Sequence, residues 1–323
     1  MKKSNRKKPV LVVCHDAGGA ELVAAYVKAH QSKEHFDCYG AGPAIHIFRR
    51  RNITMHKLDT RGDLQNFLKR HTQIRYLLLS TSWSQRLDNH LIKLARAMNI
   101  KTVVFIDHWV YYRERFGYPR PTWKENLPDE IWVSDSYALD LARKAFPKKV
   151  LIRKKTNFYF KEIRSECSQQ KASTNQKGNI LFLSEPIKAS MNSFGDENDF
   201  QFNEFEVFET LVAKLAKNHF DKSLTVRLHP AEKKTKYDRY IKKFQHLLHI
   251  KKSRNSNIIS DLAQSELVVG IDTVALVIAL LCRKKVISYF PDPVHHGTLP
   301  HTGIINLSKK HELDSALRSF IFV

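Results

Sequence analysis

The feature that most constrains the fold is an alternation of short apolar runs and helical patterns between Leu224 and Asp292. Three runs rich in β-branched residues end in polar or glycine-bearing loops, and a helical pattern follows each of the first two. This order is typical of βα units in a parallel sheet, where ligands bind outside the carboxyl ends of the strands. The residues at those ends are Arg227, His229, Gly270, Asp272, Thr273 and Asp292. This basic and hydroxyl-bearing set predicts a site for a nucleotide monophosphate or diphosphate.

The same alternation runs through the first half of the chain. Apolar runs at 10–14, 75–82, 101–109 and 128–135 predict buried strands, with helical patterns between them. The stretch 161–178 is polar and turn-prone and predicts a linker, after which the alternation restarts. A chain of 323 residues is also long for one core. We therefore expect an α/β protein with two Rossmann-like doubly wound domains facing a cleft: residues 1–160, a linker at 161–178, and residues 179–323.

Candidate catalytic residues lie at the strand ends of the first predicted domain. They are His15 and Asp16 in the turn after the first strand, and Asp107 and His108 after a later one. Gly18 and Gly19 follow Asp16 and are predicted to form an anion or acceptor loop. A glycine-bearing turn between strand and helix directs backbone N–H groups toward an anion or acceptor. Asp16 is the preferred general base, with Asp107, His108 and His15 as rivals. Asp16 could instead only cap the following helix.

The net charge of +22 favours polyanions, anionic bilayers and phosphorylated substrates alike, so it does not choose among them. The four cysteines have no CxxC spacing, which predicts reduced thiols in a cytoplasm, with Cys14 and Cys282 as buried fillers. The longest apolar run, 274–282, is well below the roughly 20 residues of a spanning helix. We expect a soluble or peripheral protein.

The segment Arg227-Leu228-His229-Pro230, followed by 268–276 opening a helix, carries a more specific signal. It resembles bacterial capsule and lipopolysaccharide glycosyltransferases of the GT-B class with an HP motif. These are the polysialyltransferase and Kdo-transferase groups and, more distantly, the CDP-glycerol glycerophosphotransferases. In those families the HP histidine and a later Ser/Thr at a helix start contact the donor phosphate. The resemblance implies these roles for His229, beside Pro230, and for Thr273.

The resemblance is clear over 179–292 and only architectural before it. Asp272 stands where serine is more usual in those families. The segment 180–186, which contains Glu185, is similar to the strand that opens their donor domain. The resemblance implies a metal-independent glycosyltransferase whose donor is a nucleotide sugar, with cytidine donors slightly favoured, and whose acceptor is a surface polysaccharide or lipopolysaccharide. No separate cofactor is expected, and the basic amino terminus would dock on the anionic inner membrane.

Other functions stay open. A sugar-nucleotide epimerase or a polyol-phosphate transferase could use the same fold. A basic nucleic-acid-binding protein would also fit the charge, although no nucleic-acid-binding module is recognisable. The histidines at 295, 296 and 301 lack the HxxxH or HExxH spacing of a metal site, so no metal is expected.

Overall fold

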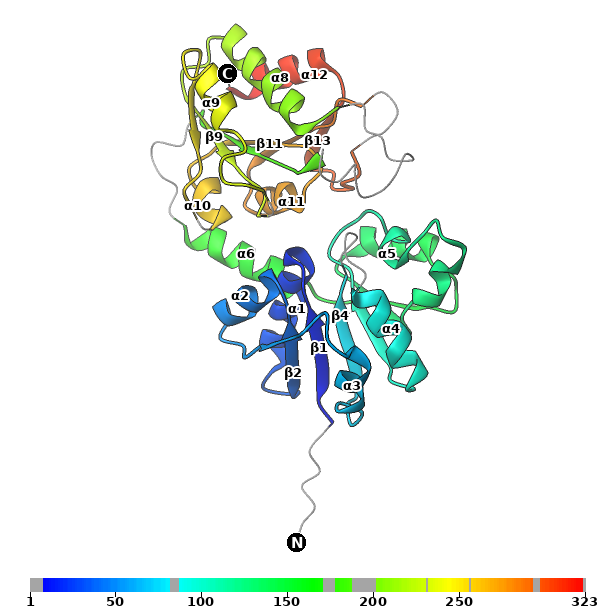
Figure 1. The fold of residues 1–323 in the computed structure, drawn as a ribbon. Helices are drawn as coiled ribbons and strands as arrows, with labels where there is room; N and C mark the ends of the chain where they lie inside the picture. The colour runs from blue at the N-terminus through cyan, green and yellow to red at the C-terminus, as the bar shows by residue number, and fades with distance from the viewer. Residues whose placement is uncertain are drawn as a thin grey trace. The chain divides into compact units, whose positions relative to one another are not determined.

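The computed structural model describes residues 8–81, 87–170, 178–187, 202–230, 232–255, 257–292 and 297–321. The chain divides into two units, Met1–Glu162 and Ile163–Val323, and each is built on one parallel sheet (Figure 1). The amino-terminal basic tail, on which the membrane prediction rests, lies outside the described residues apart from Lys8 and Pro9.

The first unit holds a parallel sheet of seven strands in the order β3-β2-β1-β4-β5-β6-β7. The strands are β1 (Val10–Cys14), β2 (Phe36–Gly40), β3 (His56–Lys57), β4 (Tyr76–Ser80), β5 (Thr102–Phe105), β6 (Glu130–Val133) and β7 (Leu151–Lys154). The helices are α1 (Ala17–His30), α2 (Pro43–Arg50), α3 (Leu64–Lys69), α4 (Leu87–Ala97) and α5 (Ser136–Ala145), with 3-10 turns η1 (Glu114–Phe116) and η2 (Pro121–Asn126). Every residue of β1 and β4 is buried, as expected for central strands covered on both faces.

The second unit repeats the topology with six parallel strands in the order β10-β9-β8-β11-β12-β13. The strands are β8 (Ile180–Leu183), β9 (Ser223–Arg227), β10 (His249–Lys252), β11 (Leu267–Gly270), β12 (Lys285–Tyr289) and β13 (Ile304–Leu307). The helices are α8 (Glu204–Lys217), α9 (Asp238–Phe244), α10 (Ile258–Leu262), α11 (Val274–Leu281) and α12 (Lys310–Ile321). In both units the strand order reverses beside the first strand, so each has a topological switch point where such folds bind ligands.

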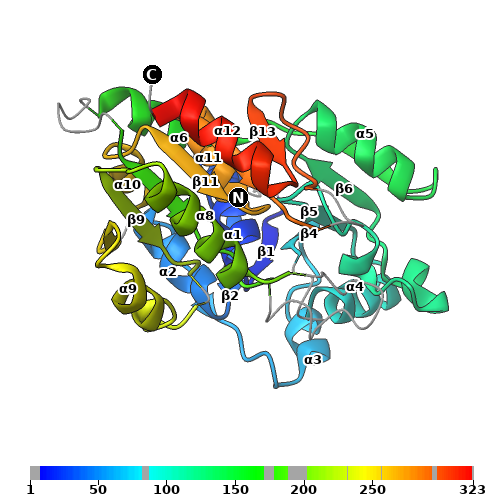
Figure 2. The same ribbon diagram turned by 90° about the horizontal axis from the view of Figure 1, so that it is seen from above.

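Amphipathic helices close the core of the second unit. In α8, Val207, Phe208, Leu211 and Leu215 are all buried at helical spacing, and they pack with Leu313 and neighbouring residues of α12 in one apolar cluster. Helices α8 and α12 lie side by side on one face of the sheet, and α11 lies on the other (Figures 1 and 2). Burial of each such side chain stabilises the fold by roughly 1.5–3 kcal/mol.

Two sequence-based expectations need correction. Helix α6 (Phe158–Gln169) occupies the first half of the segment 161–178, which was expected to be turn-prone; residues 171–177 lie outside the described part. Cys167 on α6 forms a disulfide with Cys282, which follows α11, so the prediction that all four cysteines are reduced is wrong, and Cys282 is not a buried filler. A contact between residues 115 positions apart is invisible in cysteine spacing. Cys14 and Cys38 are free and buried.

Within the described residues, no helix is long and apolar enough to cross a membrane.

Candidate functional site

In the first unit, the turn after β1 positions Asp16 at the amino terminus of α1. Asp16 has extended backbone and is the N-cap residue, and its carboxylate accepts a hydrogen bond from Gly19 N at 3.1 Å. The capping role expected as the alternative for Asp16 is therefore present. The second carboxylate oxygen accepts from the Ser80 hydroxyl at the end of β4, at 3.0 Å.

The electrostatics of Asp16 are unusual for a capping residue. Burial raises the pKa of Asp16, the nearby carboxylate of Asp107 raises it further, and together they bring it to about 6. The charge of His15 and the Gly19 amide act in the opposite direction. A carboxylate with this pKa is ionised at neutral pH but holds a proton more firmly than a surface aspartate. That is the property of a general base.

Asp107, just past the end of β5, is held by a buried arginine. Arg115 Nη1 donates to Asp107 Oδ1 at 2.9 Å and to Thr81 Oγ1 at 3.0 Å, and Arg115 is only 4% exposed. Gly18 lies directly against the other carboxylate oxygen, because a Cβ on Gly18 would come within 2.1 Å of Asp107 Oδ2. The absence of a side chain at Gly18 therefore allows α1 to approach Asp107.

His15 has a buried acidic partner. Its Nε2 lies 2.9 Å from Asp88 Oδ1 on α4, and both side chains are almost fully buried. Burial by itself lowers the pKa of His15, but the hydrogen bond and charge of Asp88 outweigh it, so the pKa is raised overall. This pair places a positive charge next to Asp16 when His15 is protonated.

His108 is oriented differently from the other candidates. Its Nδ1 accepts a hydrogen bond from the Trp109 backbone amide at 2.9 Å, so that nitrogen is not free to take a proton from an acceptor hydroxyl. The structure therefore gathers His15, Asp16, Gly18, Gly19 and Asp107 at the ends of β1 and β5. Sequence reasoning missed Asp88 and Arg115 as their partners. The position of Asp88 on the same helical face as Leu91, Ile92 and Ala95 was a usable signal, since a charge there is buried.

In the second unit, the HP segment follows β9. Burial lowers the pKa of His229, and the Lys236 charge lowers it further although the Glu232 charge opposes this. The imidazole is therefore neutral at pH 7 and can donate one hydrogen bond. Pro230 is exposed beside it.

Three residues that sequence reasoning missed hold this segment in place. Glu232 accepts a hydrogen bond from the His229 backbone amide at 2.9 Å and from the Ser184 hydroxyl at 2.9 Å. Lys236 forms an ion pair with Glu232 and another with Glu204 at 2.5 Å. The three side chains that pair in this way are nearly or largely buried. A buried network with every member paired fixes the backbone strongly, so His229 is presented by a rigid turn.

Thr273 and Glu185 meet at the start of α11. Thr273 is the N-cap residue, and its hydroxyl accepts a hydrogen bond from Ala275 N at 3.4 Å. The same hydroxyl hydrogen-bonds to Glu185, just after β8. Burial raises the pKa of Glu185 to about 7 despite that bond, with the charges of Asp272 and Glu232 adding to the effect. Within the described residues, Glu185 Oε2 is buried without a hydrogen-bond partner.

The remaining donor-side candidates have structural partners. Arg227 Nη1 lies 2.5 Å from Asp261 Oδ2 and 3.0 Å from Asn255 O. Asp272 accepts from the Thr298 amide at 3.0 Å and from the Thr298 hydroxyl. Burial raises the pKa of Asp272 above its ordinary value, although these hydrogen bonds act against it. Gly270 lets α11 pack closely on β11, because a Cβ there would lie 3.1 Å from a Leu276 methyl carbon.

Among the described residues, no group of three or more His, Cys, Asp and Glu side chains is arranged to hold a metal ion. The predicted loop histidines at 295 and 296 lie outside the described part of the chain.

No protein-family model matches this sequence, and no curated protein sequence matches it. Solved structures do resemble it. The UDP-GlcNAc 2-epimerase from Methanocaldococcus jannaschii in complex with UDP-GlcNAc and UDP has a TM-score of 0.66 at 11% identity, over 97% of this chain and 92% of that one. The UDP-GlcNAc 2-epimerase from Neisseria meningitidis bound to UDP-GlcNAc has a TM-score of 0.65 at 9% identity, over 97% and 91%.

The wall teichoic acid polymerase TagF has a TM-score of 0.51 at 11% identity, over 99% of this chain and 82% of that one. At such identities the likeness shows the fold alone. The fold is a two-domain, Rossmann-like arrangement of the GT-B type, and that part of the sequence-based prediction is confirmed.

Proposed function

We propose that this protein is a glycosyltransferase that moves a sugar from a nucleotide-activated donor to a surface polysaccharide or lipopolysaccharide acceptor. A cytidine donor is slightly favoured by the resemblance to polysialyltransferases and Kdo transferases. The observation that carries the proposal is made at the carboxyl ends of β9 and β11. A neutral His229 follows β9 on a rigid turn, and Thr273 follows β11 and caps the start of α11. Two of the structural neighbours are described as bound to UDP-GlcNAc, which supports a nucleotide-sugar ligand.

On the donor side, the nucleotide phosphate would contact His229 and the amino terminus of α11. When the bond between the sugar and the phosphate oxygen breaks, its electron pair leaves with the phosphate. A neutral imidazole N–H and the amide groups of a helix start stabilise the charge that develops there. No cofactor beyond the donor is part of the proposal, and no step requires a metal.

On the acceptor side, Asp16 would act as the base. Its carboxylate takes the proton of the acceptor hydroxyl while the hydroxyl oxygen forms the new bond to the sugar carbon. Asp107, which is ion-paired with Arg115, would raise the proton affinity of Asp16 through its negative charge. His15, which is paired with Asp88, would act on Asp16 through its charge rather than compete with it as the base.

The protein would work at the cytoplasmic face of the inner membrane as a peripheral protein. Its net charge of +22 supports attraction to an anionic lipid surface, where each basic residue near the surface contributes about 1 kcal/mol.

A sugar-nucleotide epimerase is the second candidate. The neighbouring carboxylates Asp16 and Asp107 favour it, because two adjacent acidic groups can serve as the acid and the base of an epimerisation. Product analysis separates the two functions. The transferase proposal predicts no conversion of CMP-, CDP- or UDP-sugars alone and release of free nucleotide once a glycan acceptor is added. Conversion of one sugar nucleotide into an isomer without an acceptor would replace the transferase proposal with the epimerase.

A further inference from the structure

A second binding surface lies in the second unit, at the outer edge of its sheet. β10 is the edge strand, and an open pocket of about 850 Å³ is formed by this strand with α9 and α10. Its lining includes Lys242, Lys251, Arg254, Gln245, Asn255 and Gln264. This volume is in the range of small-ligand sites.

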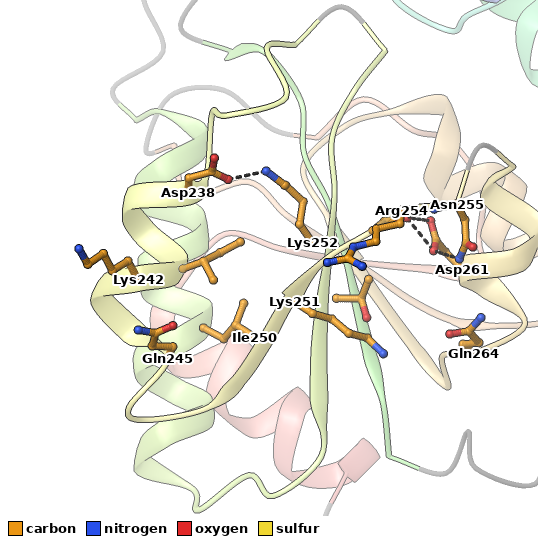
Figure 3. Close-up of a pocket in the computed structure, with 13 residues that line it drawn as sticks. Asp238, Lys242, Gln245, Ile250, Lys251, Lys252, Arg254, Asn255, Asp261 and Gln264 are labelled. Atoms are coloured by element: carbon orange, nitrogen blue, oxygen red, sulfur yellow. Dashed lines mark hydrogen bonds and ion pairs between the residues drawn. The ribbon is translucent and has the colours of Figure 1, made fainter.

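The positive charge of the pocket is only partly compensated. Asp238 pairs with Lys252, and Asp261 is paired with Arg227 and hydrogen-bonded by Ser253, so both carboxylates of the lining are already engaged. Within the described residues, Lys251 and Arg254 have no acidic partner, and both are exposed. Figure 3 shows their charged ends between α9 and α10, whereas Lys242 points outward from α9. As far as the described part of the chain shows, the pocket therefore presents two unpaired cations, Lys251 and Arg254, to an anion.

The other side chains narrow the class of ligand. Gln245 on α9, Asn255 and Gln264 supply carboxamides that both donate and accept hydrogen bonds, as sugar hydroxyl groups require. None of the described lining residues is aromatic, so the pocket offers no stacking platform for nucleic-acid bases. Its apolar part consists of Ile241 and Ile250, which are partly or fully buried and cannot insert into a bilayer.

We propose that this pocket binds an anionic glycan, with Lys251 and Arg254 contacting carboxylate or phosphate groups and the carboxamides contacting hydroxyl groups. If the proposed transferase function holds, the ligand is a segment of the growing acceptor polysaccharide, and the pocket keeps the enzyme on its polymer. Asp261 supports the pocket by positioning Asn255, which donates to its Oδ1 at 2.6 Å, and it links the pocket to Arg227 at the end of β9.

The test is a binding titration of the full chain with fluorescently labelled oligogalacturonate, without any nucleotide. The variant Lys251→Gln/Arg254→Gln removes both free cations. The control Lys148→Gln/Lys149→Gln removes the same charge from exposed positions of the first unit. We expect the pocket variant to weaken binding roughly tenfold and the control to change it little. Direct ion pairs with the ligand stabilise the complex more than the long-range attraction of distant, screened charges. A neutral maltooligosaccharide of equal length is expected to bind none of the three proteins, the wild type and the two variants.

Equal weakening of binding in the pocket variant and in the control would overturn the proposal. It would show that binding depends on the net charge of the protein and not on the pocket. Preferential, pocket-dependent binding of polyuridylate or of phosphatidylglycerol vesicles would also overturn it, in favour of nucleic acid or a membrane. Lys251→Glu provides a second exposed substitution and is expected to weaken binding further. This binding experiment contains no nucleotide donor. A negative result would therefore not bear on the proposed donor site, which the thermal-shift titration with nucleotides tests separately.

Discussion

Asp16 is the residue whose chemistry the proposed mechanism depends on most. Its carboxylate must be ionised to accept a proton, and burial beside Asp107 raises its pKa to about 6. Transferase activity is therefore expected to increase as the pH rises through about 6 and to level off above it. The Asp16→Asn substitution should lower kcat by about 100-fold or more and remove this pH dependence.

The control is Asp63→Asn, since Asp63 also caps a helix, accepting from Asn66 N at 2.9 Å, but is exposed to solvent. A pH–rate profile of Asp16→Asn that matches the wild type would exclude Asp16 as the base.

The raised pKa of Asp16 also affects the stability of the folded protein. The folded protein binds this proton more tightly than the unfolded chain, so ionisation of Asp16 lowers the free energy of unfolding as the pH rises between about 4 and about 6.

Gly18 tests the packing around Asp107. An alanine methyl at this position would lie 2.1 Å from Asp107 Oδ2, and Arg115 holds that carboxylate in place. We expect Gly18→Ala to cost about 1–3 kcal/mol of stability and to lower activity, because the carboxylate must move. Thermal unfolding and kcat would be measured beside Gly297→Ala, whose methyl would meet no atom of the described residues closer than Ser288 Oγ at 3.4 Å. Equal effects of the two substitutions would contradict this account.

At the scale of elements, α11 depends on its capping hydroxyl. Thr273→Ala removes the hydrogen bond to Ala275 N and the contact with Glu185, so we expect a loss of about 1 kcal/mol and weaker nucleotide binding. Thr273→Ser keeps the hydroxyl and is expected to keep both properties. Differential scanning calorimetry with and without nucleotide measures the two effects. Weakened binding in the serine variant would assign the role to the methyl group instead.

The disulfide between α6 and the end of α11 is a second prediction at this scale. Thiol titration of the unfolded protein, without reductant, should find two free cysteines, Cys14 and Cys38, rather than four. The bridge closes a long loop, so reduction is expected to lower the stability of the second unit by about 2–4 kcal/mol. The Cys38→Ser variant serves as the control for thiol chemistry alone. Four titratable thiols would show that the bridge does not form.

The sequence predicts the strands of this protein well but does not predict its side-chain contacts. Continuous apolar runs such as 10–14 predict central strands well, because a strand that is covered on both faces must carry apolar side chains on both. Helix α6 was missed because only Ile163 of it is buried, which leaves almost no apolar periodicity. The site was predicted at the strand ends, where residues come directly after apolar runs. Its partners Asp88, Arg115, Glu232 and Lys236 were not, since each is brought there by a helix or loop whose approach depends on tertiary packing.

At the scale of the whole molecule, the two units share one topology and carry different chemistry. The first gathers carboxylates around Asp16, and the second gathers a neutral histidine and a capped helix start. This asymmetry suits a protein that activates a hydroxyl with one unit and holds a nucleotide phosphate with the other. The charge of +22 would then concentrate anionic substrates near both.

The most direct test of the central claim is a thermal-shift titration with CMP, CDP, UDP and GDP on the wild type, on His229→Ala and on His246→Ala. A ligand that binds only the folded state raises the melting temperature according to its affinity. His246 is an exposed histidine of the same unit and serves as the matched control. The account predicts a shift with one nucleotide, with CMP or CDP favoured, that His229→Ala abolishes and His246→Ala retains. No shift with any nucleotide, together with tight, salt-sensitive binding to RNA or DNA, would contradict it.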